Sequence, residues 1–591
     1  MASLGTLIFD GDCGFCRSCV VRLRDMTGDQ VAYMPYQSWK GQRGDFENAV
    51  HFTDAQGRIL ARAAEAVFSA LATQPRYRFP LWAYRRFPFF RAVSEWAYRK
   101  VSENRKFFSW VAWILIGNDL SLPRYSRVAR VFSYGLMGLA GFSALTLALQ
   151  LPALIGDLGI LPLKPSLDRL GGMRSMDSLV SLILDFPTFA WISTGSAWIV
   201  GQGILAAALA GLSIFQRRFA TPCIWAVYFL YLSLTNMGQV FTGYQWESLL
   251  LETLFLSAFF VQTRSETVLF ALRFLLFRLM LGSGLSKMGS GDLAWTSLEA
   301  LKFHWETQPL PSPVAWWIYQ LPLFFHQFAT AMTLILETAL AFLILMPRRF
   351  RVFGFWIHGG LQVLILATGS YGYFNLLTLL LCLLLLDDTI LEKMFKLDAQ
   401  KAIQARLPEN RISNRTAKVA AWITVVLGLS TLTGSTVPFL TRLGTHFWIG
   451  NSFGLFAVMT RNRDEIILEG SEDGKVWKEI SFSFKPGRLD SVLENFGWVT
   501  PYQPRLDWQM WFAALGQFEQ QPWLKELIRQ ILQGSPNVEK LGIRHPFGTA
   551  PPRMVRASRY RYHFTSPEEY SKTGQRWMRV RLGDYSQTFT L

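Results

Sequence analysis

Residues 131–152 read VFSYGLMGLAGFSALTLALQLP, and no Asp, Glu, Lys or Arg interrupts them. A run of about 20 apolar residues is long enough to cross the hydrocarbon core of a bilayer as a helix. Comparable runs recur over the following half of the chain. This pattern predicts a polytopic α-helical membrane protein.

We count nine candidate spans, at 131–152, 189–214, 221–237, 246–262, 267–283, 323–346, 352–368, 372–386 and 419–437. Two of them carry charges: Glu247 and Glu252 in the fourth, Arg273 and Arg278 in the fifth. Charged side chains in hydrocarbon are costly and usually face the interior of a bundle or a cavity. Glu–Arg pairs that hold helices together are therefore expected here, with a polar cavity as the alternative.

The composition of all 591 residues agrees with a membrane protein. Hydrophobic residues make up 51%, and charged residues 17%, against about 25% in soluble proteins. Disordered, collagen-like, coiled-coil and wholly soluble chains are therefore excluded. Basic cytoplasmic loops account for the net charge of +17, so we expect no nucleic-acid partner.

The first residues, MASLGTLIFD, contain neither a basic segment nor a cleavage site of a signal peptide. We therefore expect the chain to start in the cytoplasm. The inner loops then carry 13 Lys and Arg residues and the outer loops 5, the bias that membrane proteins show. Nine spans would place the C-terminus on the opposite side of the membrane.

Three domains are predicted. Residues 1–126 alternate short strands and helices in the order of a thioredoxin-like α/β domain, followed by amphipathic helices suited to a membrane surface. Residues 127–437 form the transmembrane helical domain. Residues 438–591 show alternating stretches at 465–469, 477–484, 560–564 and 577–582 and a helical stretch at 508–534, which predicts a compact β-rich α+β domain.

Cys13 and Cys16 lie between the first predicted strand and the first predicted helix. A helix N-terminus stabilises a thiolate, and two intervening residues let the two cysteines form a disulfide. Cys13 is then the exposed nucleophile and Cys16 the resolving thiol. A structural turn with two buried thiols is the alternative, and Cys19 is either a core residue or a third metal ligand.

The run FDGDCGFC at 9–16, with Tyr98 and Glu103-Asn104-Arg105, resembles the DCC-type thiol–disulfide oxidoreductase family. This resemblance covers residues 1 to about 115 and implies a thioredoxin-like fold with redox-active cysteines. The strand and DxDxT loop of haloacid dehalogenases fit less well, because Gly14 stands where Thr or Val is required.

Residues from about 127 to 591 resemble the lipase maturation factor family. The motifs are GYQWESLLLET at 243–253, HWETQP at 304–309, YGYFN at 371–375, NSFGLF at 451–456 and PRLDWQMWF at 504–512. The resemblance implies a membrane-embedded factor for folding and assembly of secreted lipases or other exported clients. Its fusion to a DCC-type domain suggests a bacterial inner membrane, with the N-terminus cytoplasmic and the C-terminus periplasmic.

Two other functions remain as alternatives. The run Gly284-Leu285-Ser286-Lys287, with Trp295, is similar to a motif of vitamin K-dependent carboxylases, and implies Lys287 as a catalytic base and a quinone or lipid cofactor. Otherwise Lys287 extends from the end of a span to the membrane surface, and no cofactor is expected. A transporter is the second alternative, and the absence of an evident inverted repeat weighs against it.

Client binding is assigned to the aromatic-rich outer loop 284–322 and to the C-terminal domain. Aromatic and arginine side chains commonly dominate binding energy at interfaces. The predicted binding residues are Trp305, Arg505, Asp507, Trp508 and Trp511, with a local Arg505–Asp507 pair and with core packing as the alternative role of Trp508. Besides the client, membrane lipids are the expected partners.

Overall fold

The computed structural model describes residues 3–42, 44–173, 183–396, 411–434, 444–489, 499–548 and 550–591. The chain forms two compact units. The head unit comprises Met1–Arg124 together with Met346–Phe353 and Asp387–Thr389, and the main unit contains the other residues. The predicted boundary at 437/438 lies outside the described residues.

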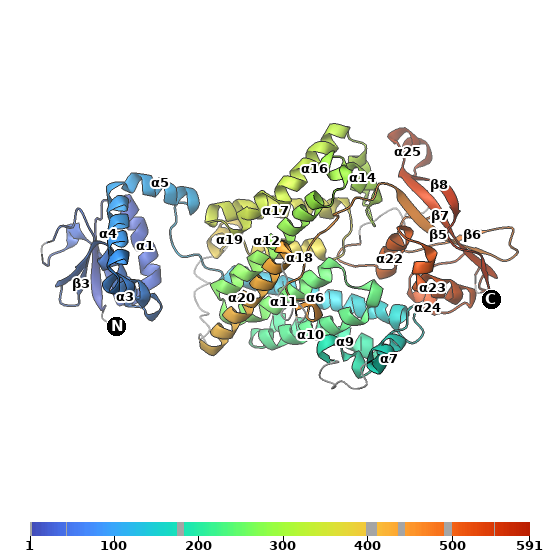
Figure 1. Cartoon of the computed structure of the whole chain (residues 1–591), viewed down its shortest axis with the longest axis horizontal. Helices are drawn as coiled ribbons and strands as arrows, with labels where there is room; N and C mark the ends of the chain where they lie inside the picture. Colours follow the sequence, from blue (N-terminus) through green and yellow to red (C-terminus); the bar gives the residue numbers. More distant parts are fainter. Residues whose placement is uncertain are drawn as a thin grey trace. The chain divides into compact units, whose positions relative to one another are not determined.

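The head unit is a small α/β domain with a four-stranded sheet of order β2-β1-β3-β4 (Figure 1). Strand β1 is parallel to β2 and antiparallel to β3, which pairs antiparallel with β4. Its elements are β1 (Gly5–Phe9), α1 (Gly14–Thr27), β2 (Val31–Pro35), β3 (His51–Asp54), β4 (Ile59–Arg62), α2 (Ala63–Ala72), α3 (Arg78–Arg86), α4 (Pro88–Glu103) and α5 (Arg105–Leu115). This confirms the predicted alternation of strands and helices.

Helix α1 connects the parallel strands β1 and β2, because a parallel pair needs a crossover. Leu7, Val31 and Phe52 from the sheet pack with Ala66 and Ala70 of α2 in one apolar core. The chain leaves β1 after Phe9 and enters α1 at Gly14, so the cysteine motif lies at the carboxyl end of a buried strand.

The helical body is defined here as the described residues from Tyr125 to Gly434, and it belongs to the main unit apart from Met346–Phe353 and Asp387–Thr389. Its principal helices are α6 (Ser126–Ile155), α7 (Lys164–Met173), α9 (Ser196–Phe215), α10 (Ala220–Met237), α11 (Gln245–Thr263), α12 (Glu266–Gly289), α13 (Leu293–Thr296), α14 (Ala300–Thr307), α15 (Pro313–Tyr319), α16 (Leu323–Glu337), α17 (Arg348–Thr368), α18 (Phe374–Leu383), α19 (Asp388–Phe395) and α20 (Arg411–Thr433).

Nine spans are not confirmed. Within the described residues, six helices are long and apolar enough to cross a membrane, and seven if the bent pair α18–α19 is one span. The six are Ser126–Ile155, Ser196–Phe215, Glu266–Gly289, Leu323–Leu345, Arg348–Thr368 and Asn414–Thr433. The predicted spans at 221–237 and 246–262 do form helices, α10 and α11, but neither is among the six. Polar residues such as Asn236 lower the hydropathy of α10, and Glu247 and Glu252 lower that of α11. The predicted span at 372–386 is the short α18, and α18 meets α19 at an angle of 110°.

Polar contacts sort the helix ends into two groups. At one end, Arg264 after α11 donates to Ser126 at the start of α6 (3.1 Å), and Arg127 pairs with Glu392 (3.2 Å). At the other end, Gln150 near the end of α6 and Gln245 at the start of α11 accept hydrogen bonds from backbone N–H groups of the C-terminal residues. Helices α6 and α11 therefore run in opposite directions through the body.

The C-terminal region, defined as the described residues 444–591, contains a five-stranded sheet of order β6-β5-β7-β8, with β9 on β7 (Figure 1). Its elements are β5 (Arg463–Ser471), β6 (Lys478–Ile480), α22 (Arg505–Ala514), α23 (Pro522–Leu532), α24 (Asn537–Lys540), β7 (Met554–Phe564), α25 (Pro567–Thr573), β8 (Trp577–Asp584) and β9 (Phe589–Thr590). The predicted strand at 477–484 is shorter than expected. The helical stretch at 508–534 forms two helices, since Pro522 begins the second.

Candidate functional site

The cysteine motif of the head unit sits at the N-terminus of α1. Cys13 is the N-cap residue, and its Sγ accepts a hydrogen bond from the backbone N–H of Cys16 at 3.1 Å. Burial raises the pKa of the Cys16 thiol to about 12, and the hydrogen bond with Cys13 acts in the same direction. This geometry suits an attacking Cys13 and a Cys16 that keeps its proton until the resolving step.

A polar network adjoins the two thiols. Arg105 at the start of α5 pairs with Asp10 (3.1 Å), and Gln37 donates to both Asp10 (3.2 Å) and Asp12 (3.1 Å). The positive charge of Arg105 lowers the pKa of the Cys16 thiol and so opposes the effect of burial. The motif at 9–16 thus joins with Arg105, far along the chain, in one site.

An apolar cavity of about 330 Å³ lies beside this network. Cys16, Cys19 and Arg105 line it together with apolar residues such as Leu7 and Phe15. Burial raises the pKa of the Cys19 thiol to about 11. Among the described residues no group of His, Cys, Asp and Glu is placed to hold a metal ion, so nothing here supports Cys19 as a metal ligand.

Lys287, near the end of α12, is buried rather than extended to the membrane surface as the alternative expected. Its Nζ lies 2.6 Å from Glu337 and 5.4 Å from the centre of the Trp295 ring. Glu337 is a partner of Lys287 that sequence spacing did not indicate.

Four of the five predicted binding residues are buried. Trp305, Arg505, Asp507 and Trp508 are at most 9% exposed, whereas Trp511 is half-buried. The predicted local Arg505–Asp507 pair was wrong. Arg505 instead pairs with Glu247 of α11 at 2.5 Å.

Asp507 accepts hydrogen bonds from the backbone N–H groups of Phe484 and Lys485 at 2.9 Å each. Burial raises the pKa of Asp507 to about 6, although these hydrogen bonds lower it. Asp507 therefore holds a loop of the C-terminal region in place, and its carboxylate is not available at the surface.

The outer loop and the C-terminal region interlock through Arg463, a buried residue that sequence reasoning missed. Its guanidinium donates to the backbone oxygens of Glu306 (2.8 Å), Gln308 and Pro309 (2.9 Å). Glu465 on the same strand pairs with it at 2.7 Å. The motif HWETQP at 304–309 is thus anchored by its backbone, which residue type alone does not reveal.

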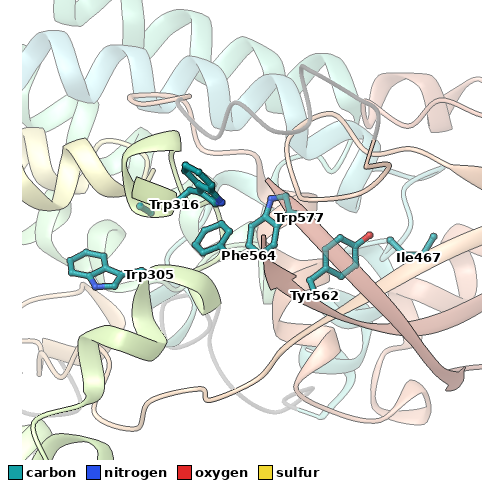
Figure 2. Packing of buried hydrophobic residues seen from close by; sticks show 7 residues of the cluster. Trp305, Trp316, Ile467, Tyr562, Phe564 and Trp577 are labelled. Atoms are coloured by element: carbon teal, nitrogen blue, oxygen red, sulfur yellow. The ribbon is translucent and has the colours of Figure 1, made fainter. Parts of the chain in front are cut away.

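Aromatic packing joins the same two segments (Figure 2). Trp316 of α15 donates through its ring N–H to the backbone oxygen of Thr565 at 3.0 Å. Phe564 and Trp577, from β7 and β8, stack with ring centres 4.2 Å apart. Trp305, Trp316, Phe564 and Trp577 therefore belong to one core shared by the loop and the sheet.

Comparisons with known proteins match three parts of the chain. Residues 127–393 match the family model of the lipase maturation factor transmembrane domain, and residues 449–587 that of the lipase maturation factor C-terminal domain. Residues 7–111 match the model of DCC1-like thiol-disulfide oxidoreductases. No solved structure matches.

Individual relatives support the same relationship. The chain is 32% identical over 601 residues to lipase maturation factor 2 of Homo sapiens, which covers 79% of this chain and 83% of the relative. It is 33% identical over 485 residues to lipase maturation factor 1 of Bos taurus, and the match covers 73% of this chain and 83% of that relative. These relatives are eukaryotic and give no support to the predicted bacterial inner membrane. The chain belongs to the lipase maturation factor family and carries a DCC1-like thiol-disulfide oxidoreductase domain at its N-terminus.

Proposed function

We propose that this protein is a membrane-bound factor that assists the folding or assembly of exported lipases or similar clients. We assign the client-directed activity to the outer loop 284–322 and the C-terminal region, not to the head unit. The observation that carries this proposal is the anchoring of HWETQP at 304–309 by Arg463. It makes the loop and the sheet a single surface.

Within this surface, client contact is assigned to side chains that solvent reaches. Trp511 is half-buried, its neighbour Phe512 is 38% exposed, and Trp317 is 60% exposed. Trp305, Arg505, Asp507 and Trp508 support the surface from within, because their burial leaves little area for a partner.

We further propose that the C-terminal region lies on the membrane side opposite to the start of α6. The opposite directions of α6 and α11, with C-terminal contacts at Gln150 and Gln245, support this arrangement. So does the charge bias of the loops. The head precedes α6 directly, so it would face the cytoplasm while the client folds on the other side.

The head unit, a thioredoxin-like domain in this proposal, performs thiol–disulfide exchange on its own side of the membrane. The Cys13 thiolate attacks a substrate disulfide, forms a mixed disulfide and releases one substrate thiolate. Cys16 then loses its proton and attacks the Cys13 sulfur. The products are a Cys13–Cys16 disulfide and a second substrate thiol, so the substrate gains two electrons; the reverse sequence oxidises a dithiol.

The test is co-expression of the full chain with a secreted lipase, measuring the specific activity of the secreted lipase and the abundance of both proteins. Trp511→Ala should lower the specific activity at normal abundance, whereas the double variant Cys13→Ser/Cys16→Ser should leave it unchanged. Ser571→Ala, in the short helix α25, is the control variant, and it should leave the specific activity of the secreted lipase unchanged. Loss of client activity in the cysteine variant alone would place the function in the head instead.

A further inference from the structure

Arg278 of α12 is buried in the helical body with much of its hydrogen-bonding capacity unused. The residue is 1% exposed, and its Nη2 donates to Glu252 of α11 at 2.5 Å. Its Nε and Nη1 have no hydrogen-bond partner among the described residues. Buried N–H groups of a charged side chain are rarely left without an acceptor.

Glu252 cannot supply the missing acceptor. One of its oxygens accepts from Arg278, and the other accepts from the backbone N–H of Gly450 (3.1 Å) and from both the backbone and the side chain of Asn451 (3.2 and 3.0 Å). Oε2 thus holds three donors and Oε1 one, and neither oxygen accepts from the Nε or Nη1 of Arg278. The Nε and Nη1 groups of Arg278 can therefore donate to an oxygen of another molecule.

A pocket of about 270 Å³ lies against this arginine. Leu285 and Phe453 contribute apolar walls, and Ser286, Thr431 and Ser452 contribute hydroxyl groups. The volume greatly exceeds the roughly 10–15 Å³ that one ordered water requires. It is large enough for a group of several non-hydrogen atoms.

The position of the pocket indicates the kind of ligand. Ser286 and Thr431 lie in the last turns of α12 and α20, both of which qualify as membrane-crossing helices. Leu285 beside them is 47% exposed. A ligand that fits this position would have an oxygen-bearing head near the end of the spans and an apolar part along the helices. Membrane lipids have this amphiphilic structure.

We propose that the pocket beside Arg278 binds the head of a membrane amphiphile, through the carboxylate of a fatty acid or the phosphate of a phospholipid. An oxygen of either group accepts from the unpartnered Nη1 of Arg278. The hydroxyls of Ser286 and Thr431, which donate to the backbone oxygens of Ser283 and Gly428, line the pocket beside it. The Phe453 ring, 5.5 Å from the guanidinium carbon, covers the arginine on one side. The hydrocarbon tail lies along Leu285.

The experiment uses the full chain purified in detergent, with photoactivatable palmitic acid as one probe and a photoactivatable phosphatidic acid as the other. Cross-linked peptides are identified by mass spectrometry. We expect labelling of the peptides that contain Leu285 or Leu432. Labelling by the fatty acid alone assigns the carboxylate, and labelling by phosphatidic acid alone assigns the phosphate.

Arg278→Lys keeps the positive charge beside Glu252 but removes the Nε and Nη1 donors, so labelling should fall about tenfold. Arg273→Lys is the matched control, because Arg273 lies on the same helix and donates to the backbone oxygen of Leu384. Its labelling should equal that of the unsubstituted chain. If Arg278→Lys lowers the Tm, Thr431→Trp, which fills the pocket and spares the ion pair, decides instead.

Two results would overturn the proposal. The first is the absence of labelling at these peptides in the unsubstituted chain with either probe. The second is labelling of Arg278→Lys and Thr431→Trp at the level of the Arg273→Lys control, since water alone would then satisfy Arg278.

Discussion

Arg505, in the C-terminal region, forms a buried ion pair with Glu247, at the start of α11 in the helical body. Arg505 also donates to the backbone oxygen of Phe241 after α10 (3.3 Å). Glu247 and Arg505 come from two of the motifs that carry the resemblance to the family, GYQWESLLLET at 243–253 and PRLDWQMWF at 504–512. The two motifs are thus two halves of one contact between the membrane-embedded helices and the C-terminal region.

This pair predicts an asymmetric effect of substitution. Removing one partner of a buried pair leaves an uncompensated charge and costs about 3–5 kcal/mol of the free energy of unfolding. Arg505→Met should therefore lower the Tm of the detergent-purified chain strongly. The double variant Glu247→Gln/Arg505→Met should lose less than Arg505→Met alone.

The control is the exposed pair Arg529–Glu526 on α23, at 2.5 Å. Exposed pairs contribute about 0–1 kcal/mol, so Arg529→Met should leave the Tm nearly unchanged. A double variant as unstable as Arg505→Met would mean that the two side chains do not depend on each other.

Trp316 and Trp317 provide a second matched comparison. Trp316 is 1% exposed in the core shared with β7 and β8, whereas its neighbour Trp317 is 60% exposed. Trp316→Ala should cost about 3–5 kcal/mol, and Trp317→Ala less than about 0.5 kcal/mol. Thermal unfolding measures both, and equal shifts in Tm would contradict the shared core.

The membrane class, the family and the cysteine motif were predictable because each depends on residues that are consecutive in the sequence. An apolar run such as 131–152 identifies a span by its length, and FDGDCGFC places a thiol between strand and helix. Long-range pairs were not predictable. Arg505 was assigned to Asp507, two residues away, and its actual partner Glu247 lies 258 residues away.

The count of nine spans is not confirmed, for a related reason. Helices α10 and α11 are buried by their neighbours, so they tolerate Glu247, Glu252 and several hydroxyl residues that a lipid-facing helix would not. Hydropathy alone does not distinguish such an interior helix from a span. Likewise, the burial of Lys287 depends on Glu337, which spacing along the chain did not reveal.

The two thiols of the head should differ in their reaction with alkylating agents. Burial is the main cause that raises the pKa of the Cys16 thiol to about 12, and burial persists when Cys13 is replaced. In Cys13→Ser, alkylation of Cys16 should be slow at pH 7 and should accelerate as the pH rises towards that value, because only the thiolate reacts.

In Cys16→Ser, the remaining Cys13 should react faster at pH 7 than Cys16 does in Cys13→Ser, because Cys13 caps the start of α1 whereas burial raises the pKa of the Cys16 thiol. Mass spectrometry of peptide 9–16 after timed alkylation separates the two variants, with an unfolded sample as reference. Equal rates for the two variants at pH 7 would remove the assignment of Cys13 as nucleophile.

Membrane topology can be tested with a reporter that is active only outside the cytoplasm. We expect activity when the reporter follows Leu591 or is inserted after Gly291, at the end of α12. We expect none after Ser121, before α6, or after Arg218, between α9 and α10. The physical reason is the alternation of helix directions, which places the ends of α6 and α12 on the side of the C-terminal region.

If α10 and α11 did not cross, they would form a loop that leaves both of their ends on one side. Arg218 would then lie on the same side as Gln245, and a reporter at Arg218 would share the activity of one at Gln245. If α10 does cross, a reporter inserted after Gly243, just before Gln245, should be active, and silence both there and after Arg218 would contradict a crossing of α10.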